Sequence, residues 1–93
     1  MADAPSILIV DDEPVARSRL RELLADLAPE FPHRIVGEAP NAPEALSQIE
    51  ASQPQIVMLD IQMPGMTGIE LARHISARAQ SGESPRPMPL IIF

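Results

Sequence analysis

One stretch of the sequence decides its fold: Ile56-Val57-Met58-Leu59-Asp60-Ile61-Gln62-Met63-Pro64-Gly65. Four apolar residues precede Asp60, and Pro64 and Gly65 beyond it favour a loop. An uninterrupted apolar run of this length is typical of a strand buried on both faces of a parallel sheet. We therefore expect Asp60 at the carboxyl end of that strand, the edge at which open α/β sheets bind ligands. The alternative is an aspartate that only stabilises the turn.

A second apolar run, residues 7–10, ends in the same way and is followed by Asp11-Asp12-Glu13. Parallel strands end at one edge of a sheet, so these acids are expected near Asp60. Clustered carboxylates repel one another unless a cation neutralises them, and magnesium prefers hard oxygen ligands of this kind. The alternative is that the acids only favour the start of the helix that follows.

These acids predict a magnesium site together with a nucleophile. Asp11 and Asp12 are the expected metal ligands, directly or through water, together with Asp60. The backbone carbonyl of Gln62 is a further candidate ligand. A strand-end carboxylate beside a bound metal can attack phosphorus, which makes Asp60 the expected nucleophile.

The remaining sequence alternates strands with helices. Strands are expected at 7–10, 34–39, 56–59 and 90–93, and helices from Pro14 to about residue 28, from Asn41 to Ser52, and after Thr67. This order predicts an α/β fold in which helices cover both faces of a parallel sheet. The apolar stripe of the first helix is predicted to be Ala16, Leu20, Leu23, Leu24 and Leu27. That of the third helix is predicted to be Ile69, Leu71, Ala72, Ile75 and Ala79. Arg17, Arg19 and Arg21 are interpreted as a solvated helix face.

The length, charge and amino-acid composition of the chain exclude several classes of function. The chain has 93 residues, enough for one small domain, and a net charge of -6. Its seven bases are all arginine, and this acidic balance argues against direct binding of nucleic acid or an anionic membrane by this segment. Cysteine is absent, which excludes disulfides and thiolate metal sites. No apolar run has the length of a membrane helix and the start does not look like a secretion signal, so we expect a cytoplasmic location.

The two acidic motifs together resemble a known family. Leu8-Ile9-Val10-Asp11-Asp12-Glu13-Pro14 and Met58-Leu59-Asp60-Ile61-Gln62-Met63-Pro64-Gly65-Met66-Thr67-Gly68 resemble the response-regulator receiver domains of bacterial two-component systems. The resemblance implies a flavodoxin-like sheet of order 2-1-3-4-5 and a signalling module, not an enzyme. It also implies that Asp60 accepts a phosphoryl group from a histidine kinase with magnesium. More loosely, residues 13–20 resemble receivers joined to LytTR-type DNA-binding domains.

The sequence also departs from the family pattern. Receivers carry Thr or Ser after the fourth strand and Lys after the fifth, whereas this sequence contains no lysine and stops at Phe93. We expect residues 1–93 to form the N-terminal three quarters of a receiver, without its fourth helix, fifth strand and fifth helix, with an output domain beyond. An uncovered last strand at 90–93 would expose unpaired backbone groups. A homodimer or larger assembly is therefore expected for this chain.

Three other functions compete with this interpretation. An inactive pseudo-receiver that acts as an interaction module fits the same motifs. A metal-dependent phosphatase with an aspartate nucleophile usually has a second Asp two residues later, where this sequence has Gln62. A dinucleotide-binding domain needs glycine in the turn after the first strand, and residues 11–14 contain none.

Overall fold

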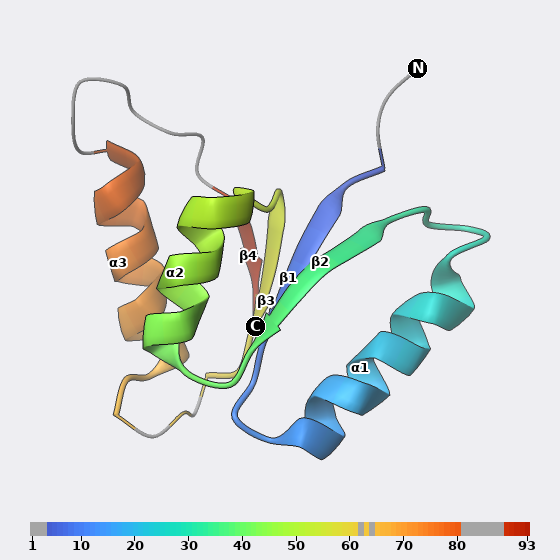
Figure 1. Ribbon diagram of the computed structural model, residues 1–93, viewed down its shortest axis with the longest axis horizontal. Helices are drawn as coiled ribbons and strands as arrows, with labels where there is room; N and C mark the ends of the chain where they lie inside the picture. The colour runs from blue at the N-terminus through green and yellow to red at the C-terminus, as the bar shows by residue number, and fades with distance from the viewer. Residues whose placement is uncertain (1–3, 62, 64, 81–88) are drawn as a thin grey trace.

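The computed structural model describes residues 4–61, 63, 65–80 and 89–93. Strands and helices alternate along the chain in the order β1 (Ser6–Val10), α1 (Pro14–Leu27), β2 (Arg34–Ala39), α2 (Ala42–Ser52), β3 (Ile56–Leu59), α3 (Gly68–Gln80) and β4 (Leu90–Ile92). The strands pair in parallel in the order β2-β1-β3-β4, with α1 on one face and α2 and α3 on the other (Figure 1). The predicted α/β architecture, with helices on both faces of a parallel sheet, is confirmed, and so is the predicted order of these four strands.

The face under α2 and α3 holds the larger core. Alternate residues of β1 and β3 point to this face, and they pack with apolar side chains of both helices and the loop after β3. The fully or nearly buried members are Leu8, Val10, Ala39, Ala42, Ala45, Val57, Leu59, Met63, Leu71 and Ile75. Arg78 of α3 also pairs with Glu50 of α2, which joins the two helices at the surface.

The face under α1 is less completely covered. Its buried cluster among the described residues consists of Ile7, Ile9 and Leu24, while Ile56 and Met58 of β3 are only half-buried. The prediction that residues 56–59 are buried on both faces is therefore wrong for this face. Of the helices that the structure describes, α1 alone lies over this face, and it shields β1 more fully than β3.

Two predicted helix stripes also need correction. In α1, Leu23 and Leu27 are 60% and 46% exposed, so the buried side of this helix is narrower than predicted and centres on Leu24 and Leu20. In α3, Ile69 is 49% exposed, whereas Leu71 and Ile75 are buried as expected. Apolar spacing shows which side chains could be buried, and the neighbouring elements decide which of them are.

The helix starts follow the sequence signals. Asn41 Oδ1 accepts a hydrogen bond from the backbone N–H of Glu44 at 2.9 Å, and Thr67 Oγ1 accepts one from the backbone N–H of Glu70 at 3.2 Å. The sequence places the starts of these two helices at Asn41 and after Thr67, and both contacts are N-caps at those positions. They fix where α2 and α3 leave the carboxyl edge of the sheet.

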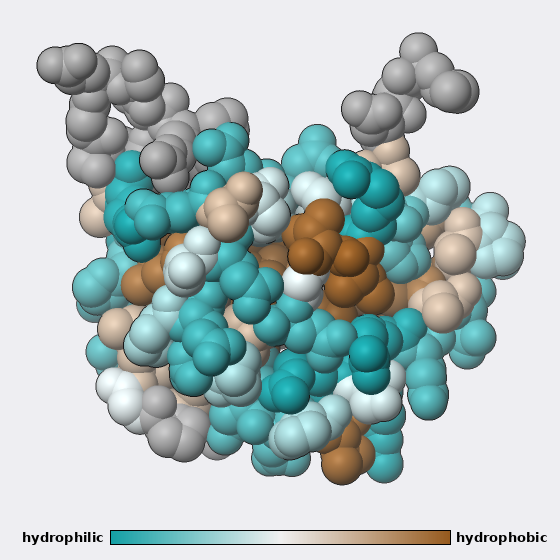
Figure 2. Space-filling view, viewed as in Figure 1, coloured by the Kyte–Doolittle hydropathy of each residue, from teal (hydrophilic) through white to brown (hydrophobic). Residues whose placement is uncertain are grey.

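A β-bulge in β2 changes which side chains face α1. Ile7 pairs with Ile35 but Leu8 pairs with Gly37, so Val36 is the extra residue of the bulge. After the bulge, Glu38 lies beside Ile9 and points to the α1 face, which it would not do in an unbroken register. Figure 2 shows an apolar area over β2, where Ile35 and Val36 are half-buried.

Candidate functional site

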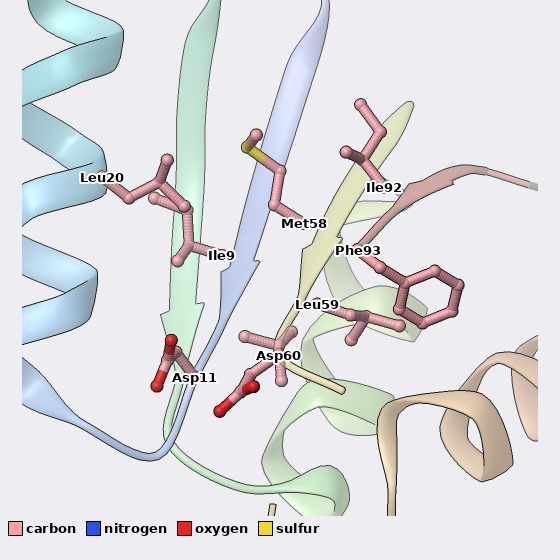
Figure 3. A pocket seen from close by; sticks show the side chains of 9 residues that line it. Ile9, Asp11, Leu20, Met58, Leu59, Asp60, Ile92 and Phe93 are labelled. Carbon is pink, nitrogen blue, oxygen red and sulfur yellow. The ribbon is translucent and has the colours of Figure 1, made fainter. Parts of the chain in front are cut away.

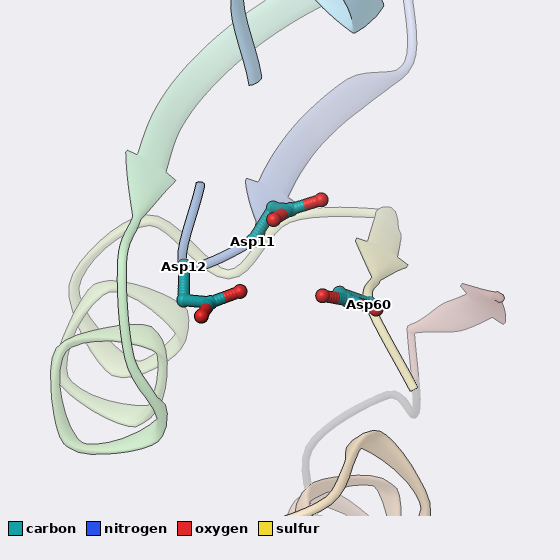
Figure 4. Close-up of side chains that lie close together, drawn as sticks. All are labelled: Asp11, Asp12 and Asp60. Atoms are coloured by element: carbon teal, nitrogen blue, oxygen red, sulfur yellow. The ribbon is translucent and has the colours of Figure 1, made fainter. Parts of the chain in front are cut away.

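Three aspartates meet at the carboxyl edge of the sheet. Val10 is the register partner of Leu59, so Asp11 and Asp60 follow neighbouring strands at the same level. One carboxylate oxygen from each of Asp11, Asp12 and Asp60 lies within 4.8 Å of the other two. Figure 4 shows the three side chains around a common space. The arrangement places three hard oxygen donors where one cation could contact them together.

Main-chain hydrogen bonds fix the two strand ends. The N–H of Asp60 donates to the carbonyl of Val10 at 2.9 Å, and the N–H of Asp11 donates to the carbonyl of Ala39 at 3.1 Å. Asp11 Oδ1 also accepts the backbone N–H of Glu13 at 2.9 Å. Asp11 and Asp60 are both half-buried. The hydrogen bonds of the sheet therefore hold the backbone from which each carboxylate projects.

The start of α3 packs closely against Asp60. The N–H of Gly68 donates to the carbonyl of Ile61 at 2.8 Å. A Cβ atom at position 68 would lie 2.5 Å from the backbone oxygen of Asp60 and 2.9 Å from the Cα of Ile61. Only glycine lets α3 approach this closely, so this glycine of the motif has a direct role in placing the Asp60 loop. Gly65, with φ of +85°, makes the turn between them.

An apolar hollow adjoins the acidic site on the α1 face. Ile9, Leu20, Met58, Ile92 and Phe93 contribute its apolar walls, and the two strand-end aspartates stand at one end. Figure 3 shows Asp11 and Asp60 beside these side chains. The carboxylates therefore lie between water and a low-polarity surface, where an interaction with a cation is stronger than in bulk water.

The structure brings together three of the four predicted metal ligands. The fourth, the backbone carbonyl of Gln62, lies outside the described residues. Glu13 is the N-cap residue of α1, but its side chain makes no capping hydrogen bond. Among these acids, it is Asp11 that stabilises the start of α1, because its carboxylate accepts a hydrogen bond from the N–H of Glu13.

Arg17 is a site residue that the sequence did not reveal. Its guanidinium Nη1 donates to the backbone carbonyl of Asp11 at 2.7 Å, and its side chain is only 18% exposed. The interpretation of Arg17 as part of a solvated face is therefore wrong, although Arg19 is exposed as expected. The sequence does place Arg17 about one helical turn after the acids. That spacing permits a contact with Asp11 but does not specify one.

Comparison with known proteins agrees with this geometry. The family model described as the response regulator receiver domain matches residues 7–93. The chain belongs to the response regulator receiver domain family. An uncharacterised response regulatory protein of Vibrio cholerae is 43% identical over 86 residues, covering 92% of this chain and 30% of that protein. The positive alginate biosynthesis regulatory protein of Pseudomonas aeruginosa is 42% identical over 89 residues, covering 95% and 32%.

Solved structures show the same fold. A LuxR-family two-component response regulator from Aurantimonas has a TM-score of 0.72 and 35% identity, covering 81% of this chain and 51% of that one. The receiver domain of the response regulator NarL from Mycobacterium tuberculosis has a TM-score of 0.68 and 29% identity, covering 82% and 59%. The chain spans about a third of the length of the curated relatives cited above.

Receiver domains generally bind Mg²⁺ at an acidic site, and the three aspartates have the chemistry for it. All three donors are carboxylate oxygens, which suit a small divalent cation that keeps several waters.

Within the described part of the chain, every helix is too short or too polar to cross a membrane.

Proposed function

We propose that this chain is the phosphoacceptor segment of a two-component response regulator and that Asp60 receives the phosphoryl group. The supporting observation is the meeting of Asp60 with Asp11 and Asp12 within 4.8 Å at the carboxyl edge of the sheet. The proposed donor is a phosphohistidine of a histidine kinase. Mg²⁺ would be held by the three aspartates and by the backbone carbonyl of Gln62.

In the proposed transfer, a carboxylate oxygen of Asp60 bonds to phosphorus while the phosphorus–nitrogen bond of the donor breaks. The products are an acyl phosphate on Asp60 and a histidine side chain that takes up a proton. Bound magnesium would offset the negative charges of the carboxylates and the phosphoryl oxygens. The chain contributes position: the hydrogen bond to Val10 and the close approach of Gly68 fix where Asp60 stands.

The proposal extends to the protein that carries this segment. Residues 1–93 are proposed to supply the N-terminal three quarters of a receiver, joined to an output domain that regulates transcription. Some matched relatives are named transcriptional regulatory proteins, which supports this output. A cytoplasmic location belongs to the same proposal, since response regulators are typically cytoplasmic.

Chemical phosphorylation tests the assignment. The full-length protein, incubated with acetyl phosphate and Mg²⁺, is expected to gain one phosphoryl group by intact-mass spectrometry. Asp60→Asn should remove the adduct, because the amide is no longer an anionic nucleophile. Asp26→Asn is the matched control, an exposed acid on α1 away from the site. Failure of the wild-type protein to gain the adduct would favour the inactive interaction module, and labelling that survives Asp60→Asn would refute the role of Asp60.

A further inference from the structure

We propose that Arg17 is a positioning residue that holds the Asp11–Asp12 pair ready for the metal, and that Glu38 holds Arg17 in turn. The inference rests on the proposed function, because it gives these residues a role toward the same metal site. It concerns Arg17 and Glu38, which lie outside the set of three aspartates.

Arg17 makes two contacts with one planar group. Nη1 donates to the backbone carbonyl of Asp11 at 2.7 Å, and Nε lies 3.3 Å from Oε1 of Glu38. A guanidinium presents its donors in a rigid fork, so the contact to Glu38 sets the direction in which Nη1 points. An ammonium on a flexible stem cannot fix both partners in this way.

Glu38 is itself fixed on three sides. The β-bulge at Val36 turns its side chain toward α1, where Oε2 lies 3.2 Å from Nη1 of Arg21. Its backbone carbonyl accepts Nε2 of Gln48, from α2 on the opposite face, at 2.8 Å. Glu38 thus links both helix layers at the edge of the sheet, and its side chain is only 26% exposed.

The carbonyl that Arg17 contacts belongs to the peptide group joining Asp11 to Asp12. Peptide groups are planar, so fixing this carbonyl sets the direction in which the chain enters Asp12. The N–H of Asp11 is already bound to Ala39 on the other side. One arginine therefore orients the backbone from which both carboxylates project, much as outer partners orient the ligands of other metal sites.

Charge and position predict opposite effects for the loss of Arg17. A positive guanidinium near a cation site repels the cation, so removing its charge alone would tighten Mg²⁺ binding. Removing its hold on the Asp11–Asp12 peptide would loosen the ligands and weaken Mg²⁺ binding. The sign of the change separates the two roles.

The test is Mg²⁺ binding to the full-length protein, measured by calorimetry on the wild type and five single variants, the fifth being Asp12→Asn. Arg17→Gln, Arg17→Lys and Glu38→Gln are each expected to weaken Mg²⁺ affinity, the first by about tenfold. Arg19→Gln removes the same charge from an exposed site on the same helix and should stay within about twofold. If changes at Arg17 impair folding, Glu38→Gln frees Arg17 without altering α1. Because the lost charge of Glu38 would by itself weaken Mg²⁺ binding, the carbonyl ¹³C shift of Asp11 is the deciding readout for this variant. The carbonyl ¹³C shift of Asp11 should move in the Arg17 and Glu38 variants, since it reports the hydrogen bond directly.

Asp12→Asn separates failure of this inference from failure of the proposed site. If Asp12→Asn weakens Mg²⁺ binding but Arg17→Gln leaves it unchanged or tightens it, the inference about Arg17 is overturned while the aspartate site stands. If the wild type does not bind Mg²⁺, or Asp12→Asn binds it equally well, the proposed site falls and the role of Arg17 falls with it. Unchanged binding in Arg17→Lys would show that the rigid fork of the guanidinium is not needed and would also overturn the positioning role.

Discussion

The two faces of the sheet are built from the same strands but are sealed to different degrees. Under α2 and α3, Val57 and Leu59 of β3 are 0% and 4% exposed. Under α1, their neighbours Ile56 and Met58 are half-buried, and the apolar hollow beside Asp60 opens there. Within the described residues, two helices cover the first face and one covers the second. The difference shows that the number of helices covering a face, more than the strand sequence, decides how fully its side chains are shielded from solvent.

The largest expected effect compares two buried leucines, one beneath each helix layer. Leu71 is 0% exposed within the large cluster, and Leu24 is 5% exposed within the small one. Leu71→Ala should lower the free energy of unfolding by about 4 kcal/mol, and Leu24→Ala by about 2–3 kcal/mol, because fewer neighbours surround the second cavity. Urea unfolding measures both. Equal losses would mean that the two faces are packed equally well.

A smaller difference is expected within β3 itself. Val57→Ala should cost about 2 kcal/mol, because Val57 is fully buried under α2 and α3. Met58→Ala should cost about 1 kcal/mol although it removes more atoms, because Met58 is half-buried on the α1 face. The same unfolding measurements apply. A larger loss of unfolding free energy for Met58→Ala than for Val57→Ala would show that the α1 face is as well shielded in solution as the α2 and α3 face.

The smallest expected effect on stability is at β4, the outer strand of the sheet in the described residues. Ile92 is 41% exposed, so Ile92→Lys should change the unfolding free energy by no more than about 1 kcal/mol. The 93-residue chain alone is expected to associate through this strand, whose apolar edge carries no charge. Ile92→Lys should shift it toward the monomer in light scattering after size exclusion. A monomeric wild-type chain at tens of micromolar would refute this association.

Much of the fold follows from sequence because local signals agree with one another. The apolar runs at residues 7–10 and 56–59 predict the central strands, and the caps at Asn41 and Thr67 predict where two helices begin. Each of these signals acts over a few residues. The clustering of Asp11, Asp12 and Asp60 could also be predicted from sequence. Each lies at or just after the end of a predicted strand, and parallel strands end at one edge of a sheet.

The missed features depend on contacts between distant elements. Leu23 and Leu27 fit a helical stripe, but their exposure depends on how α1 lies on the sheet. Arg17 meets Glu38 only because a bulge at Val36 turns β2. Gly37 in that strand is compatible with a bulge, but it does not specify which residue is the extra one. The close approach of Gly68 to Asp60 likewise depends on where α3 starts in space. Sequence pattern identified the three aspartates that cluster at the sheet edge, whereas the contacts of Arg17 and Gly68 beside them required the structure.

The most direct test of the account is to locate the phosphoryl group chemically in the wild-type protein. After phosphorylation with acetyl phosphate and Mg²⁺, borohydride reduction converts an aspartyl phosphate into homoserine, which tandem mass spectrometry can place in the sequence. If Asp60 is the phosphoacceptor, reduction is expected at Asp60 alone, and none is expected when a chelator removes Mg²⁺ before phosphorylation. Reduction at another carboxylate, or equal reduction at Asp60 without the metal, would contradict this assignment.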